Sequence, residues 1–346
     1  MGKNATVLFR SMILDGAILT FVFVTSIVAA LSPVEEELLM LGRNSLIVAG
    51  TWGISAIIVL LLHFGGVRTL GNVLFDPPKI DHMGSDKPWF LTFWGMELIL
   101  AFIIAFVTGI YITDFDPLEL FSEDGWVGTV RIFSQLVDPN FSVLPRAVLA
   151  IIETIFIAFM ATVFAVPVAF VMSFLCAKNV MGGHPTTFFI YTILRSLLNV
   201  TRSIEPLIWA IVFSVWVGIG PFSGMLALLI HSIASLAKNY SELVECVDEG
   251  PIEAIQATGG NALQVIWFAI VPQIVLPYTA FTIYRWDINV RMATIIGLVG
   301  GGGIGTMLIQ YQGQAMWREV GCLVIVIAAV VWVMDATSAY IREAIK

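Results

Sequence analysis

The sequence predicts an all-α protein that crosses a membrane several times, and three observations lead to this fold class. Of its 346 residues, 58% are hydrophobic and only 12% are charged, whereas a soluble domain carries about 25% charged residues. The mean hydropathy is +0.93. The apolar residues also gather in long runs, and a helix needs about 20 mostly apolar residues to span a bilayer.

About eight apolar segments are expected to be membrane-spanning helices. The first three are 11–31, 45–64 and 89–112, and the later five are 147–177, 185–218, 222–237, a span that begins at 271 and includes 271–284, and 319–340. The first run has no small-residue cleavage site after it, so we interpret it as a retained span. Pro167 predicts a kink in the fourth span. Pro206, in the middle of a segment too long for one straight crossing, predicts a broken or tilted helix.

The stretch 113–145 is acidic and rich in turn residues, and it predicts a boundary between two parts of the chain. We therefore expect an N-terminal extension with three spans (1–115), an acidic external loop (116–146) and a transmembrane domain (147–346). The distribution of Lys and Arg favours a cytoplasmic location for both termini. The net charge of −8 lies on short loops, and no basic patch suggests nucleic-acid binding.

A moderately polar stretch at about 239–272, here called the coupling loop, separates two strongly apolar blocks. Apolar residues alternate there with carboxylates such as Glu249 and Glu253. This pattern is typical of amphipathic helices that bury one side in the groove of a partner protein. Helices that lie on lipid prefer Lys and Arg on their polar face, so the acidic character favours protein docking.

Charged residues inside the apolar segments are the second candidate site, because each unpaired charge in a membrane is costly. They are Arg195, Arg202, Glu205, Arg285, Asp287 and Arg291. One interpretation is mutual pairing, of Arg202 with Glu205 and of Arg285 with Asp287 or a neighbouring helix. The other is a water-filled path for an anion, since four arginines face two acids. The sequence leaves both open.

The glycine-rich stretch 297–305 formally contains G-x-G-x-x-G at Gly300, Gly302 and Gly305. A dinucleotide site needs a strand before this motif, and apolar helices surround it here. We therefore expect irregular backbone that is buried or lines a cavity, with N–H groups that could bind an oxyanion. The scattered His and Cys residues predict no metal site and no catalytic site.

Several of these blocks resemble a known family. Glu253 and Ala254, with Gly259 six residues after the glutamate and Pro272 beyond it, resemble the "EAA" loop of ABC importer permeases, with apolar replacements at Ile255, Ala269 and Val271. The blocks 202–222, 285–305 and 335–342 are similar to the phosphonate permease branch of that family. This resemblance covers about 139–346, and the first 115 residues match no family that we can name.

The resemblance implies a type I importer permease with a five-helix core in 147–346, working as a homodimer by alternating access. It also implies two copies of an ATPase subunit, which would hold ATP and Mg, and an external substrate-binding protein. This chain would be a non-enzymatic, multi-pass component of the cytoplasmic (inner) membrane, in contact with lipid and without a cofactor. Its substrate would be a phosphorus oxyanion such as phosphonate, phosphite or hypophosphite.

The resemblance also implies roles for particular residues. ATPase coupling is expected at Glu249, Glu253, Ala254, Gly259 and Pro272. The translocation pathway is expected at Arg202, Ser203, Glu205, Arg285, Asp287, Arg291, Gly300, Gly302 and Gly303.

Three alternatives stay open at this point. A permease of the same architecture could carry another small solute such as methionine. An ion-coupled secondary transporter would have repeated halves, and no internal repeat is visible. A membrane-embedded enzyme could use Glu97, Glu153 or Asp335, but these acids are dispersed along separate predicted helices.

Overall fold

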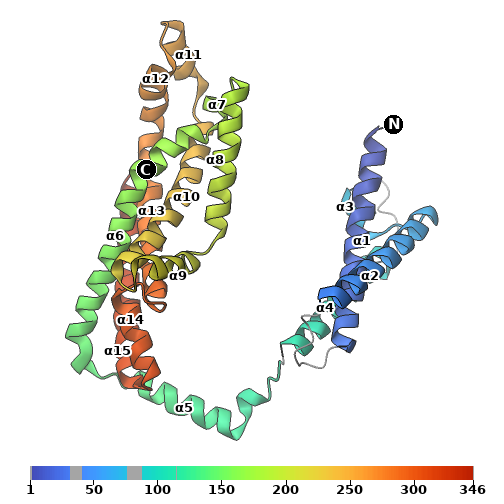
Figure 1. Ribbon diagram of the computed structural model, residues 1–346, viewed down its shortest axis with the longest axis horizontal. Coiled ribbons are helices and arrows are strands. Elements are labelled where there is room, and N and C mark those ends of the chain that lie inside the picture. Colours follow the sequence, from blue (N-terminus) through green and yellow to red (C-terminus); the bar gives the residue numbers. More distant parts are fainter. Residues whose placement is uncertain (1, 32–40, 76–87, 114, 346) are drawn as a thin grey trace. The chain divides into compact units, whose positions relative to one another are not determined.

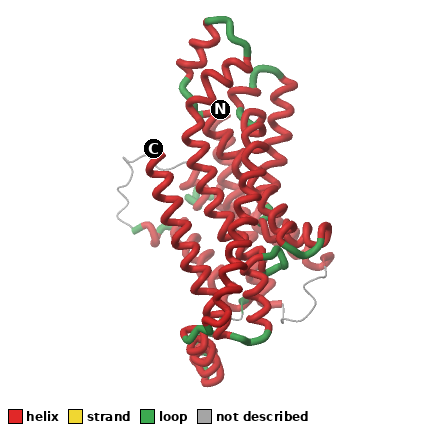
Figure 2. The backbone as a smooth tube through the Cα atoms, turned by 90° about the vertical axis from the view of Figure 1, so that its left-hand side faces the viewer, coloured by secondary structure: helices red, strands yellow, loops and turns green. Residues whose placement is uncertain are grey.

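The computed structural model describes residues 2–31, 41–75, 88–113 and 115–345. It divides into two compact units, Met1–Gly125 and Trp126–Lys346. Every regular element among the described residues is a helix (Figure 2). The predicted all-α fold class is therefore confirmed.

The first unit contains helices α1 (Gly2–Leu31), α2 (Leu41–Phe64), α3 (Leu70–Phe75) and α4 (Phe93–Ile112), with 3₁₀ turns at Trp89–Leu91 and Glu119–Phe121. Two carboxylates fix the short helix α3 between its longer neighbours. The Gly71 amide donates to Asp15 of α1 over 2.6 Å, and the Leu70 amide donates to Glu97 of α4 over 3.2 Å. These N–H groups have no partner within a helix, so the acids satisfy them inside an apolar environment.

The boundary between the units falls within α5 (Glu123–Val137), and the second unit continues with a 3₁₀ turn (Phe141–Val143) and α6 (Leu144–Leu175). There follow α7 (Lys178–Met181), α8 (Pro185–Ser203), α9 (Pro206–Val217), α10 (Pro221–Glu245), α11 (Glu249–Ala257), α12 (Ala262–Val265), a π-helical turn (Ile266–Ile270), α13 (Val271–Gly297), α14 (Gly303–Gly313) and α15 (Trp317–Ile345). Helices α6, α10 and α13 pack against one another, and α11 and α12 lie at one end of this unit while α5 and α14 lie towards the other (Figure 1).

Small residues form the contact between the central helices. Ala158, Ala161, Ala165 and Ala169 recur on one face of α6 and are completely buried, as is Ala234 of α10. In a membrane, helices associate through close van der Waals packing, which small side chains allow. The alanine stripe therefore lets α6 and α10 form the rigid centre that positions the other helices.

The predicted spans agree with the structure in kind, but their number and some of their boundaries differ from the eight expected. Six described helices are long and apolar enough to cross a membrane, and a seventh counts if α8 and α9, which meet at 90°, form one broken span. The second predicted span falls on α2, whose described apolar part is Val48–Phe64. The break near Pro206 is confirmed. Helix α6 continues as one 32-residue helix that contains Pro167.

Three boundaries differ from the expectation. The span expected at 222–237 continues to Glu245, and the span that begins at 271 continues to Gly297. In the stretch expected to be rich in turns, residues 123–137 form α5, because Trp126, Val130 and Phe133 recur at helical spacing between the acidic residues. The division into 1–115, 116–146 and 147–346 stays a prediction.

Candidate functional site

The coupling loop forms two short helices that project from the end of the second unit (Figure 1). Helix α11 turns Ile252 towards the core of the unit and leaves Glu249, Glu253 and Ala254 exposed. The two carboxylates are four residues apart and share one face of the helix. The predicted coupling residues therefore lie on an accessible, acidic surface.

Local backbone chemistry ends α11 and starts the next helix. Gly259 has a φ of +81°, a conformation that L-residues with a side chain rarely adopt. Two residues later, the side chain of Asn261 accepts the Gln264 amide over 2.9 Å, and the Asn261 amide donates back to the Gln264 side chain over 2.8 Å. Pro272 lies in the first turn of α13, directly after the π-helical turn Ile266–Ile270.

A cavity of about 520 Å³ lies behind α11. It is lined by residues of α11, α12 and the end of α10, including the acids Glu245, Glu249 and Glu253. The space leaves α11 standing away from the helices beneath it. The three carboxylates that line it add negative charge to the same side of the coupling loop.

The second group of predicted site residues gathers around the break between α8 and α9, here called the α8–α9 bend. Arg202 and Ser203 end α8, and Glu205 precedes the first residue of α9. His231 of α10 donates from Nδ1 to the Ile204 carbonyl over 3.2 Å. This bond holds the bend against the central helix.

Arg285 of α13 lies on the same side of the molecule, close enough to interact electrostatically with both Glu205 and His231. Its side chain is buried, with only 9% of the residue exposed. Its Nε donates to the Ser232 hydroxyl over 3.2 Å, whereas Nη2 has no protein partner among the described residues. A buried guanidinium without a full set of acceptors is costly, so this group is available to bind an anion.

A polar network supports Arg285 from within the core. The Asn289 amide nitrogen donates to Ser232 over 2.8 Å and to Thr162 of α6 over 2.9 Å. Asn289 is fully buried. The network links α6, α10 and α13 at the level of Arg285 and restricts the position of that side chain.

Of the two interpretations left open, mutual pairing of Arg202 with Glu205 and of Arg285 with Asp287 is not what the described structure shows, and the reason is helix geometry. Asp287 pairs with Arg291 over 2.6 Å, and Arg291 also pairs with Asp335 of α15 over 3.1 Å. Residues four apart share a helix face, whereas residues two apart do not, so Asp287 cannot face the same way as Arg285. The pair of Arg202 with Glu205 fails to form in the described structure because α8 ends at Ser203.

The glycine-rich stretch forms the irregular connection between α13 and α14, as predicted. Gly300, Gly302 and Gly303 all have positive φ values, of 91°, 82° and 69°. A side chain at Gly302 would meet Pro221 at 2.8 Å. The loop therefore packs directly on the start of α10. Glycines are required there because the backbone has positive φ values and because a side chain at Gly302 would clash with Pro221.

Two N–H groups at the start of α14 have acceptors within the chain. The Gly303 amide donates to Glu153 over 3.3 Å, and the Ile304 amide donates to the Thr154 hydroxyl over 2.9 Å. A cavity of about 330 Å³ lies beside this loop. In this structure a carboxylate from α6 takes the position that an oxyanion was expected to take.

Sequence reasoning missed His231, Ser232, Asn289 and Thr162. Each is a polar residue in an apolar helix, and this was the available signal. The scattered histidines were instead interpreted as structural, because their positions along the sequence do not show that α6, α10 and α13 pack against one another. Glu245 was also missed as the partner of Arg195, at 2.6 Å.

No cluster of His, Cys, Asp or Glu that could hold a metal ion occurs within the described ranges. Cys176 is buried at the end of α6, and burial raises the pKa of its thiol. A neutral, buried thiol behaves as a small apolar side chain.

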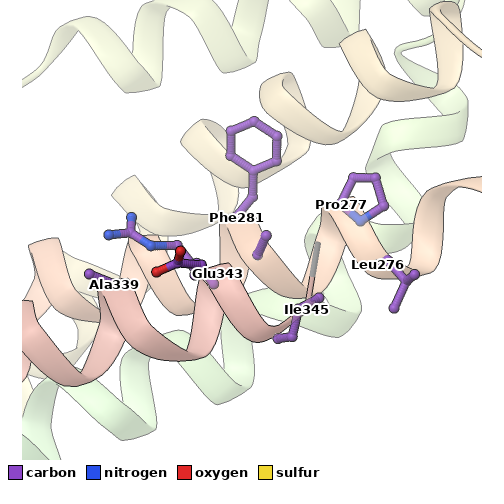
Figure 3. A pocket seen from close by; sticks show the side chains of 8 residues that line it. Leu276, Pro277, Phe281, Ala339, Glu343 and Ile345 are labelled. Carbon is purple, nitrogen blue, oxygen red and sulfur yellow. The ribbon is translucent and has the colours of Figure 1, made fainter.

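A further groove lies away from these polar residues. It has a volume of about 960 Å³ and lies between α13 and α15, where Leu276, Pro277 and Phe281 face Ala339 and Ile345 (Figure 3). Arg342 and Glu343 are its charged members, and the Arg342 guanidinium stacks over Tyr284 at 5.2 Å. Its lining is mostly apolar and includes none of the predicted site residues.

Comparisons with known proteins agree with this arrangement. Residues 169–345 match the family described as "Binding-protein-dependent transport system inner membrane component". The phosphite transport system permease protein PtxC of Stutzerimonas stutzeri is 32% identical over 250 residues, which cover 72% of this chain and 89% of PtxC. The phosphate-import permease protein PhnE of Mycolicibacterium smegmatis is 32% identical over 293 residues, covering 82% of this chain and 52% of that protein.

Among solved structures, the MetNI methionine ABC transporter in inward-facing conformations has a similar fold. The TM-score is 0.52 at 20% sequence identity, and the match covers 60% of this chain and 99% of that chain. This likeness concerns the fold alone. Together with the extent of the family match and the PtxC identity, it leads to one conclusion: the chain belongs to the family of inner membrane components of binding-protein-dependent transport systems.

Proposed function

We propose that this chain is the translocating subunit of an ATP-driven importer for a small phosphorus oxyanion, such as a phosphonate, phosphite or hypophosphite. The relatives named for phosphite and phosphate transport support this substrate class. A methionine permease of the same architecture is the alternative, and the charges around the α8–α9 bend favour the oxyanion.

The observation that carries the proposal is the surplus of positive charge at the α8–α9 bend. Arg195 and Arg291 are neutralised by carboxylates elsewhere. Arg202 and Arg285 both interact electrostatically with His231, and Glu205 is the acid among the described residues that interacts with Arg285. Two guanidinium groups against one carboxylate favour an anion, and arginine matches the planar fork of two oxyanion oxygens well.

The depth of this site is consistent with a substrate pathway. Ser232, which contacts Arg285, precedes the end of α10 at Glu245 by thirteen residues. A helix rises 1.5 Å per residue, so the contact lies about 20 Å from that end. The hydrocarbon core of a bilayer is about 30 Å thick. The charged site is thus expected near the middle of the membrane, reached through the broken helix pair.

The partners follow from the same proposal. Two ATPase subunits would dock on the coupling loops of two copies of this chain and bind ATP and Mg, while an external binding protein delivers the substrate. Glu249, Glu253, Ala254, Gly259 and Pro272 would form the coupling surface. The loop and both termini would then lie in the cytoplasm. The chain itself would carry no cofactor and catalyse no reaction.

ATP hydrolysis by the reconstituted complex tests the substrate class. The complex, with its binding protein, is presented with phosphonate, phosphite, hypophosphite, phosphate and methionine. Stimulation by one or more phosphorus compounds, with none by methionine, is the expected result. Stimulation by methionine alone would exclude the oxyanion, and failure to recover any ATPase partner would exclude the importer.

A bulky side chain at Gly259 tests the coupling surface. The positive φ of this residue and its exposed position predict that Gly259→Trp distorts the end of α11 without affecting the membrane core. A left-handed conformation costs an L-residue about 1–2 kcal/mol. ATP hydrolysis should continue while uptake is lost. Gly183→Trp, at an exposed glycine outside the coupling loop where a Cβ would meet nothing within 4 Å, is the matched control, and normal uptake by a stably inserted Gly259→Trp chain would refute the assignment.

A further inference from the structure

Glu245 occupies an unusual position at the boundary between the membrane core and the coupling loop. It is the last residue of α10, and only three residues separate it from the first residue of α11. Its carboxylate accepts from Arg195 of α8 over 2.6 Å and from the Lys178 amide over 2.9 Å. One side chain thus joins α10, α7 and α8 at the base of the coupling loop.

The surroundings make this pair stronger than a surface ion pair. The Arg195 and Glu245 side chains are only 28% and 25% exposed, whereas exposed pairs contribute little because water and salt screen them. Arg195 also donates to the Tyr191 hydroxyl over 2.8 Å and to the Cys176 carbonyl over 3.3 Å. These contacts fix the guanidinium in one orientation towards Glu245.

Helix α8 connects this pair to the proposed substrate site. Arg202 follows Arg195 by seven residues, which is two helical turns or about 10 Å along the same face. The helix is continuous between them and ends at Ser203, directly at the α8–α9 bend. A displacement of the cytoplasmic end of α8 must therefore move Arg202, because a short unbroken helix moves as a rigid body.

A second contact fixes the other side of the coupling loop to α13. The Asp248 amide donates to the Gln273 side-chain oxygen over 3.0 Å. Gln273 lies at the start of the helix that carries Arg285. Both helices that bring arginines to the proposed site are thus attached to the loop, and only the attachment to α8 depends on an ion pair.

We propose that the Arg195–Glu245 pair transmits movement of the coupling loop to the α8–α9 bend, so that both are positioning residues for transport. This inference rests on the proposed function, because it assumes that an ATPase moves the loop. The pair holds α8 to the end of α10, from which the coupling loop continues to α11. When the loop moves, Arg202 changes its position relative to Arg285, and the site opens or closes.

Charge reversal tests this proposal in the complete complex, reconstituted with its ATPase and binding protein. The measured quantity is the number of solute molecules taken up per ATP hydrolysed. Arg195→Glu and Glu245→Arg should each lower this ratio about tenfold, the size of effect that a coupling energy within the range for contacting residues produces. The double reversal Arg195→Glu/Glu245→Arg should restore most of the ratio, because the ion pair forms again with its members exchanged.

Lys238→Glu is the matched control. Lys238 and Glu242 form an ion pair within α10 at the same end of the unit, 3.7 Å apart, and this pair joins no second helix. The control should keep its ratio within about twofold of wild type, as expected for a weak surface pair. Glu245→Gln, which keeps an acceptor for the Lys178 amide, replaces Glu245→Arg if the reversal fails to insert.

The outcomes separate this inference from the proposed function. The ratio is measured with whichever solute the wild-type complex transports, so an incorrect substrate class leaves the test intact. Unchanged coupling in both single reversals would overturn the inference. Equal loss in the single and double reversals, with all chains inserted and thermally stable, would overturn it as well, because the effect would then not depend on the pair.

Discussion

The two faces of α13 carry arginines in opposite situations. Arg285 is buried, hydrogen-bonded to neutral Ser232 and left with an unpartnered Nη2 within the described structure. Arg291, six residues later, lies about 240° further around the helix and pairs with Asp287 and Asp335. Identical residue types in one apolar segment thus differ in whether carboxylates balance their charge, and only the first is suited to bind an anion.

This contrast distinguishes two kinds of charge in one membrane helix: a charge that is available for binding, and a charge that joins neighbouring helices. A neutralised arginine joins helices, here α13 with α15, and its removal should affect stability first. An arginine without a carboxylate partner lowers stability and persists where it binds something else. The two faces can therefore be tested by whether a substitution changes uptake or stability.

Replacing Arg285 should give the largest loss of uptake. Without such a loss, the contrast between Arg285 and Arg291 would not hold. Arg285→Gln removes the charge that we assign to substrate binding, and loss of one partner from a desolvated charge contact costs at least about 2 kcal/mol. Uptake should fall by about 30-fold or more. Thermal stability of the solubilised complex should stay level or rise, because an uncompensated buried charge is gone. Full uptake with Arg285→Gln would remove this residue from the pathway.

Replacing Arg291 should give the opposite result. Arg291→Gln leaves Asp287, which is only 3% exposed, without its cation. Loss of a partly buried partner predicts a stability decrease of about 2 kcal/mol, between the values for exposed and buried pairs. Uptake per folded complex should stay within about threefold of wild type. The milder variant Asp335→Asn, at the half-exposed end of the cluster, should lower the melting temperature less.

Replacing Asn289 should give the smallest effect on stability and uptake. It tests whether Arg285 depends on the polar network that supports it. Asn289→Ala removes two donor contacts, to Thr162 and Ser232. Hydrogen bonds between membrane helices contribute about 0.6 kcal/mol on average, so stability should fall by about 1 kcal/mol. The affinity for the solute should weaken as Arg285 loses its support, measured as a higher half-saturating concentration in uptake. A change in stability with an unaltered half-saturating concentration would limit Asn289 to a structural role.

Much of the fold was predictable because its signals are local. Run length and composition predicted the spans, Pro206 the break between α8 and α9, and the glycines at 300, 302 and 303 the irregular connection. Helix ends were less accurate, since α10 and α13 continue through polar residues that are paired with neighbouring helices. Helix α5 was missed because the acidic, turn-rich residues that precede it dominated the interpretation of the whole stretch 113–145.

The candidate site was predictable only in part. Composition placed Arg202, Glu205 and Arg285 inside apolar segments and so identified them as costly charges. It could not assign their partners, because pairing depends on the helix face and on which helices are neighbours. His231 and Asn289 join the site through α10 and α13, at distances along the chain that no spacing rule covers.

Composition and hydropathy predicted a polytopic helical membrane protein, and the sequence motifs resembled those of importer permeases. Both properties depend on hydrophobic burial and local backbone conformation, which neighbouring residues control. The three-dimensional structure was needed to show that Arg291 pairs with carboxylates, that Nη2 of Arg285 has no partner among the described residues, and that Glu245 joins the coupling loop to α8. These outcomes depend on electrostatic interactions across helices, whose strength falls with separation in space and not along the chain.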